Sequence, residues 1–118
     1  MVNGMPMMCL TDEFHNRMRI VTPVAEMKDV TDEQIRAAME GNFHSALDVK
    51  YAISSDVMWV AYIHPLKELT KDQLLDAISQ VYNGAMTFGT IYTSTELGFP
   101  KSEKDQEKQK KKEKTKRS

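Results

Sequence analysis

The sequence is poor in cysteine, in membrane-type apolar runs and in glycine-rich nucleotide-binding motifs. Cys9 is the only cysteine among the 118 residues, which excludes an internal disulfide and is typical of the reducing cytoplasm. No run is long and apolar enough to cross a membrane, and residues 1–10 lack the basic start and apolar core of a secretory signal. The length predicts one domain, which we expect to be cytoplasmic.

The net charge of -1 conceals two regions of opposite sign. Residues 101–118 contain nine Lys or Arg and four Asp or Glu, a net charge of +5. The totals of 16 basic and 17 acidic residues therefore leave seven and thirteen for residues 1–100, a net charge of -6. Because residues 101–118 include no apolar side chain, they cannot bury enough surface to offset the entropy cost of ordering. We expect one folded domain over residues 1–100 and a disordered basic Lys/Glu tail over residues 101–118.

The longest apolar stretch of β-forming residues covers residues 49–66 and predicts a β-hairpin. Residues 54–56 are short and polar, as a turn between two strands requires. In the second strand alternate side chains point to opposite faces, and both sets are mainly apolar. We therefore expect this strand, which carries Trp59 and Tyr62, to lie inside a sheet that is covered on both faces. Pro65 ends the strand because proline has no N–H to donate.

Residues 30–46 predict a helix from its start signals and its periodicity. Thr31 stands at the N-cap position and Gln34 follows three residues later, which is the spacing of a capping box. Gly41 weakens a helix by about 1 kcal/mol relative to alanine, so a helix end at this residue is an alternative. The apolar side chains repeat at helical spacing and form one stripe that we expect to face the core: Ile35, Ala38, Met39, Phe43 and Ala46.

Residues 69–92 repeat the same start chemistry and predict a second helix. Thr70 is the N-cap and Gln73 completes the capping box. A broad apolar face follows, formed by Leu74, Leu75, Ile78, Val81, Tyr82, Ala85 and Met86. Residues 90–99 are ambiguous between the last helical turns and a short extension.

Two shorter strands are predicted before the first helix, over residues 7–11 and 17–24, with a turn between them. The second strand alternates, with Met18, Ile20 and Thr22 on one face and Arg17, Arg19 and Val21 on the other. The resulting order, β-β-α-β-β-α, predicts an α+β fold. We expect a mostly antiparallel sheet with the two helices packed largely on one side.

Three blocks of sequence resemble the YbjN-type domains, which share the fold of the type III secretion chaperones. The blocks are NFHSALDVKYAIS (residues 42–54), VAYIHPLKELT (residues 60–70) and AMTFGTIY (residues 85–92), and the resemblance covers roughly residues 17–99. It implies a twisted antiparallel sheet with flanking helices, usually in a homodimer. It also implies a chaperone-like or regulatory role, because secretion chaperones of this fold bind extended client segments along exposed apolar grooves.

The resemblance does not extend to the front of the chain. Members of the family usually begin with an amphipathic helix and a further strand, whereas only about sixteen poorly patterned residues precede Arg17 here. The chain is then either a shortened member or one whose start has been placed too late. In both cases we expect an exposed apolar sheet face that another subunit covers. Flexible methionines suit adaptable binding surfaces, and Met7, Met8 and Met18 lie near this edge.

The sequence carries no pattern of a catalytic or metal site. His15, His44, His64 and Cys9 lie on separate predicted elements and match no zinc spacing. Neither a G-x-S-x-G motif nor a phosphate-binding or dinucleotide-binding loop is present. We expect no enzyme, no cofactor and no metal, and an enzyme is a remote alternative.

The sequence therefore predicts a non-enzymatic protein-binding module that acts as a homodimer, with itself and a polypeptide client as partners. Six residues are predicted to lie in the core or at an interface: Met18, Ile20, Trp59, Tyr62, Ile78 and Tyr82. The alternative is a regulatory protein that binds nucleic acid through the basic tail. Interspersed glutamates and the lack of aromatic residues in the tail make nucleic acid the less favoured partner.

Overall fold

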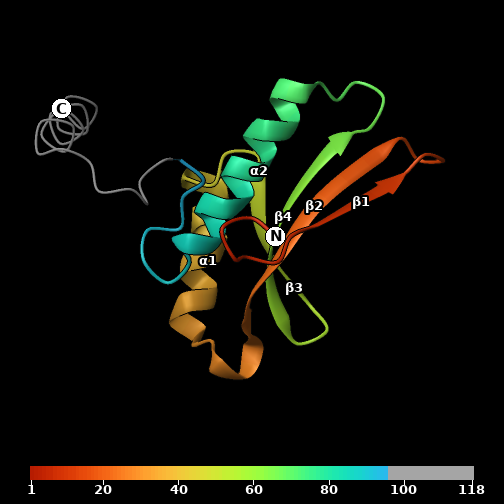
Figure 1. Cartoon of the computed structure of the whole chain (residues 1–118). Coiled ribbons are helices and arrows are strands. Elements are labelled where there is room, and N and C mark those ends of the chain that lie inside the picture. Colours follow the sequence, from red (N-terminus) through yellow and green to blue (C-terminus); the bar gives the residue numbers. More distant parts are fainter. Residues whose placement is uncertain (96–118) are drawn as a thin grey trace, which may run out of the picture.

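The structure is a computed structural model that describes residues 1–95. The order of elements is β-β-α-β-β-α, as the sequence predicts (Figure 1). Their bounds are β1 Met8–Asp12, β2 Arg17–Glu26, a 3-10 turn Met27–Asp29, α1 Asp32–His44, β3 Val49–Ser54, β4 Val57–Pro65 and α2 Lys71–Met86. The predicted tail over residues 101–118, and part of the ambiguous segment before it, lie outside the described residues.

The four strands form one antiparallel sheet in the order β1-β2-β4-β3. β4 is therefore a central strand, as its apolar sequence predicts. β2 pairs with it along its whole length, and the register shifts between Pro23 and Ala25. Proline is tolerated at such a bulge. The regular hydrogen bonding between the strands is already interrupted there, so the missing N–H of proline costs little.

The polar residues predicted to form a turn do so: β3 and β4 are joined by the two residues Ser55 and Asp56. Ser55 and Asp56 have φ angles of 51° and 61°, in the left-handed region. A two-residue loop of this kind matches the right-handed twist of the flanking strands. The backbone N–H of Met27 donates to the Asp56 carbonyl at 2.8 Å, which ties the turn to the end of β2.

Both helices begin with the predicted capping box. The hydroxyls of Thr31 and Thr70 accept from the backbone N–H of Gln34 and Gln73, whose side chains accept from the threonine N–H groups. Such a cap satisfies backbone donors that have no partner inside the helix. α2 ends at Met86, six residues before the predicted end.

The core lies between the sheet and the two helices. α2 packs against β2, β3 and β4, and α1 packs against β3 (Figure 1). The alternation predicted for β2 is confirmed, because Met18, Ile20 and Thr22 are 1%, 2% and 0% exposed. The other strands and α2 supply further buried residues: Val49, Tyr51, Met58, Val60, Tyr62, Ala77 and Val81.

The expectation that β4 is covered on both faces is wrong for the single chain. Within residues 1–95 the helices cover one face only, so Trp59 and Ala61 are half-buried and Ile63 is 59% exposed. The reason is that an apolar pattern on both faces shows that each face avoids water, but not whether the cover comes from the same chain.

The predicted core stripe of α1 is also partly wrong. Ala38 and Ala46 are buried, but Met39 and Phe43 are 68% and 85% exposed. Small residues face the core instead, because the segment after α2 returns against α1 at Gly41. Ile35 is half-buried and packs against the core, as predicted, whereas the Met39 and Phe43 side chains lie mainly in solvent.

Candidate functional site

The face of the sheet opposite the helices presents an apolar surface that the described chain does not cover. We define this open face by seven residues of β1, β2 and β4, namely Met8, Leu10, Arg19, Val21, Trp59, Ala61 and Ile63. They share a face because antiparallel partners project to the same side and side chains alternate along each strand. Met8, Leu10 and Ile63 are 45%, 44% and 59% exposed.

Two hollows lie side by side on the open face. One, of about 280 Å³, is lined by residues of β1–β4: Met8, Leu10, Arg19, Val21, Ala52, Ser54, Trp59 and Ala61. The other, of about 310 Å³, is lined by Leu10, Thr11, Asp12, Arg17, Arg19 and Ile63. Leu10 and Arg19 line both hollows, so the hollows adjoin, and we call the two together the groove.

Trp59 is the only tryptophan of the chain and lies within this groove. Its indole N–H donates to the Ser54 carbonyl at 3.1 Å. This bond satisfies the polar atom of the ring and leaves the apolar ring in place across β3 and β4. Its fluorescence therefore reports directly on occupancy of the open face.

The charged side chains at one end of the groove differ in the number of hydrogen bonds and ion pairs that they make. His15 donates to Asp12 from its backbone at 3.1 Å and contacts it through Nδ1 at 2.7 Å, and these hydrogen bonds lower the pKa of the Asp12 carboxyl. Arg17 donates to the carbonyls of Asn16 and His15 at 2.9 and 3.4 Å. Arg19 makes no side-chain hydrogen bond or ion pair with any described residue.

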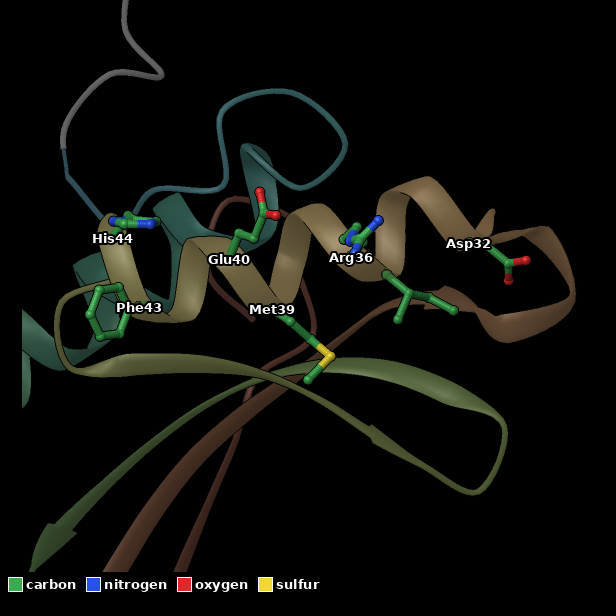
Figure 2. Close-up of a pocket in the computed structure, with 7 residues that line it drawn as sticks. Asp32, Arg36, Met39, Glu40, Phe43 and His44 are labelled. Carbon is green, nitrogen blue, oxygen red and sulfur yellow. The ribbon is translucent and has the colours of Figure 1, made fainter.

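A second apolar surface lies on α1, where seven residues line a hollow of about 680 Å³ (Figure 2). The residues form two rows at four-residue spacing. The apolar row is Ile35, Met39 and Phe43, and the polar row is Asp32, Arg36, Glu40 and His44. Figure 2 shows Met39 and Phe43 projecting from one side of the helix and Glu40 from the other. We call this surface the α1 groove.

The six residues predicted for the core or an interface fall on three surfaces. Met18, Ile20 and Tyr62 are buried between the sheet and α2. Trp59 lies on the open face, whereas Ile78 and Tyr82 are half-buried on α2. The structure does not bring the six together, and their part in binding stays a prediction.

The sequence predicts an exposed apolar sheet face and places Met8 near it, but it does not identify most of the residues of the open face or the direction of the α1 groove. The sequence does contain a pattern for each surface. For the open face, Arg19 and Val21 alternate with the buried residues of β2 and so lie on its other side. The four-residue spacing of the α1 rows was also visible. It was read as a stripe facing the sheet, because spacing gives the width of a helix face and not its direction.

Within residues 1–95, no group of three His, Cys, Asp or Glu side chains is placed to hold a metal ion. His64 contacts the Pro65 carbonyl through Nδ1 at 2.8 Å and stacks on Tyr62. Burial raises the pKa of Tyr51 to about 12, and its hydroxyl donates to the Gly84 carbonyl at 2.8 Å, which is a structural role.

Comparison with known proteins gives structural matches alone. No protein-family model matches the sequence, and a search of curated proteins finds no match. A chain of the HopA1–SchA chaperone–effector complex matches with a TM-score of 0.60 and 11% identity, over 75% of this chain and 70% of that chain. A chain of the ExsC–ExsE complex matches with a TM-score of 0.56 and 13% identity, over 70% of this chain and 71% of that chain.

At these identities the matches show the fold, which is α+β and like that of secretion chaperones. The narrower resemblance to YbjN-type domains stays a prediction. No helix within residues 1–95 is long and apolar enough to span a bilayer.

Proposed function

We propose that this protein is a non-enzymatic, chaperone-like module that binds extended polypeptide segments and acts as a homodimer in the cytoplasm. The observation that carries the proposal is the open face, where one mainly apolar hollow and one with a charged lining adjoin on a sheet of the secretion-chaperone type. A solvent-exposed apolar patch that charged residues interrupt is typical of a protein–protein contact.

The edge of the sheet beside the open face supports binding of an extended segment. All five residues of β1 are exposed, and β1 pairs with β2 along one edge only. At the opposite edge the main chain of Tyr51 is already occupied, because Asn42 donates to the Tyr51 carbonyl at 3.1 Å and accepts from its N–H at 2.7 Å. A client segment can therefore pair with β1 through main-chain bonds, and where it continues over the open face its side chains can enter the hollows.

The α1 groove supports the homodimer. Rows of side chains at four-residue spacing pack into the grooves of a second helix, and in a two-fold contact each residue meets its counterpart in reverse order. If two copies of α1 pack antiparallel about Met39, then Ile35 of one copy lies near Phe43 of the other. The charges of the polar row also match across nearly the same two-fold axis, because Arg36 of one copy then faces Glu40 of the other.

The dimer is tested by charge exchange. Arg36→Glu places like charges opposite each other at both symmetric positions, so the dissociation constant of the dimer should rise about tenfold or more. Arg36→Glu combined with Glu40→Arg restores both pairs and should restore the dimer. Light scattering across micromolar concentrations measures the effect, with thermal unfolding as the control for helix stability. A monomer at all concentrations, or equal association of single and double variants, refutes the α1 contact.

Client binding is tested with a synthetic peptide of about nine residues in which Val and Leu alternate with Ser. Such a peptide spans roughly 30 Å when extended, and its binding should shift the emission of Trp59. Leu10→Ser should weaken binding about fivefold, because a half-exposed leucine supplies roughly 1 kcal/mol when it becomes covered. Met39→Ser, on the α1 groove, is the matched control and should leave peptide affinity unchanged. Absence of saturable binding, or equal affinity in Leu10→Ser, overturns the proposal.

A further inference from the structure

We propose that the open face prefers polypeptide segments that carry a carboxylate, which the Arg19 guanidinium binds. The inference rests on the proposed function and names the chemistry of its partner. Two observations support it. Arg19 lies in the middle of the groove, and the neighbouring charged side chains already have hydrogen-bonding or ionic partners.

Arg19 stands in the middle of the open face. Its cross-strand partners are Leu10 on β1 and Ile63 on β4. Both partners are apolar and about half exposed, and Arg19 lines both hollows. An extended segment that fills the groove therefore passes the guanidinium, whichever way the segment runs.

The other cations near the open face are held by the chain itself. Arg17 donates to two carbonyls of the preceding turn. Lys50 extends from β3 but donates through Nζ to the carbonyls of Ala46 and Leu47, at 2.9 and 3.0 Å. Arg19 is left as the cation of the groove with no ionic or hydrogen-bonding partner among the described residues.

The two acids at the ends of β1 and β2, Asp12 and Glu26, already have partners other than Arg19. His15 occupies both carboxylate oxygens of Asp12. Glu26, at the far end of β2, forms an ion pair with Lys28 at 3.1 Å. A carboxylate of a bound segment would thus meet Arg19 without displacing an existing pair.

The setting strengthens such a pair beyond an ordinary surface contact. Guanidinium binds carboxylate through two parallel hydrogen bonds, which gives both affinity and orientation. Covering Leu10 and Ile63 with the bound segment removes water from both sides of the pair. We expect about a fivefold preference, above the two- to threefold that an exposed ion pair commonly provides.

Two other occupants fit the groove less well. A second copy of the chain that packs its open face here brings the two Arg19 side chains towards each other. Residues 101–118 carry a net charge of +5, of the same sign as Arg19. Charge complementarity therefore favours an acidic segment of another polypeptide.

The test uses two peptides with the same alternating Val, Leu and Ser core, one with Glu at both ends and one with Lys. Trp59 emission should show about fivefold tighter binding of the Glu peptide at about 20 mM salt, and a smaller difference at about 300 mM. Arg19→Gln should remove the preference and Arg19→Glu should reverse it. Lys71→Gln, at the exposed start of α2 and away from both hollows, is the matched control and should leave the preference in place.

The outcomes separate this inference from the function on which it rests. Equal binding of both peptides, or a preference that survives in Arg19→Gln, overturns the inference alone and leaves Arg19 as a side chain whose stem covers apolar surface. If neither peptide binds, nor the uncharged Ser peptide, both proposals fail. Self-association that Leu10→Ser removes, but that charge exchange in α1 does not affect, would assign the open face to a second copy and also overturn the inference.

Discussion

The contact between α1 and the segment after α2 can be tested at a single glycine. Gly41 lies inside α1, where alanine would normally stabilise the helix by about 1 kcal/mol. A Cβ added at Gly41 would lie 2.8 Å from the Cβ of Tyr92 and 3.1 Å from its carbonyl oxygen. The first distance is shorter than real contacts between such atoms, so either α1 or the returning segment must move.

The two effects oppose each other, and we expect the clash to win. Overpacking of a tight contact costs about 1–3 kcal/mol, against the gain of about 1 kcal/mol in helix propensity. Relaxation is costly because Tyr92 is 8% exposed and its ring packs against Tyr51 and Phe88. Gly41→Ala should therefore lower the free energy of unfolding by about 1 kcal/mol.

Urea unfolding followed by far-ultraviolet circular dichroism measures this difference. Two backgrounds isolate its cause, because Tyr92→Ala retains the Cβ that Gly41→Ala would strike, whereas Tyr92→Gly removes it. Gly41→Ala should stay destabilising in the first background and become neutral or stabilising in the second. If Gly41→Ala stabilises the unaltered chain, or if the two backgrounds respond alike, the close approach is not what selects glycine here.

Three further predictions concern the edge strand, a buried phenol and the two faces of β4. Asn42→Ala should destabilise the protein by about 2–4 kcal/mol in urea unfolding, because two backbone groups of Tyr51 lose their partners, and Asn42→Asp should recover only the bond to the Tyr51 N–H. Burial raises the pKa of Tyr51 from 10.0 to about 12, so the unfolded phenol ionises first. The contribution of the neutral phenol to stability should be complete below pH 10 and lost between pH 10 and 12. In that range the free energy of unfolding should fall less steeply with pH in Tyr51→Phe than in the unaltered chain. Met58→Ala should cost about 2–5 kcal/mol and Ile63→Ala about 1 kcal/mol or less, because Met58 is 2% exposed and Ile63 is 59% exposed; equal losses would contradict the assignment of faces.

The sequence predicted those parts of the fold that depend on local chemistry. Both helix starts follow from threonine and glutamine at capping-box spacing, and the turn at Ser55 and Asp56 follows from short polar residues between two apolar runs. The face of β2 that enters the core follows from its alternation alone. These signals act over a few residues, so they can be read without knowing the rest of the chain.

The parts that the sequence did not predict depend on contacts between distant residues. α2 ends at Met86 because the hydroxyl of Thr87 donates to the Asn83 carbonyl and accepts from the N–H of Thr93, which turns the chain back. That return brings Tyr92 against Gly41 and gives the core side of α1 to small residues. The exposure of Met39 is then a consequence of packing some fifty residues away in sequence, and no local pattern carries it.

The candidate site was hidden for a related reason. Trp59 and Val60 are neighbours on β4, both apolar, yet one is half-buried on the open face and the other is 0% exposed beneath the helices. Periodicity separates the two faces but does not say which face the chain itself covers. Knowledge of where the helices lie is needed to decide this, and it becomes available only once the connections are placed.

Because side chains alternate in β2 and β4, one set of residues is buried when the chain folds and the other set stays exposed to a partner. Met18, Ile20 and Val60 are fully enclosed by the single chain, so their burial contributes to folding whether or not a partner is present. Leu10 and Ile63 lose much less of their exposure on folding, so most of their apolar free energy remains for a later contact. A bare apolar sheet face promotes self-association, and the charge of Arg19 at its centre opposes the packing of two such faces against each other. The same charge then selects what replaces water on that face, which is why stability and selectivity depend on different residues of the same strands.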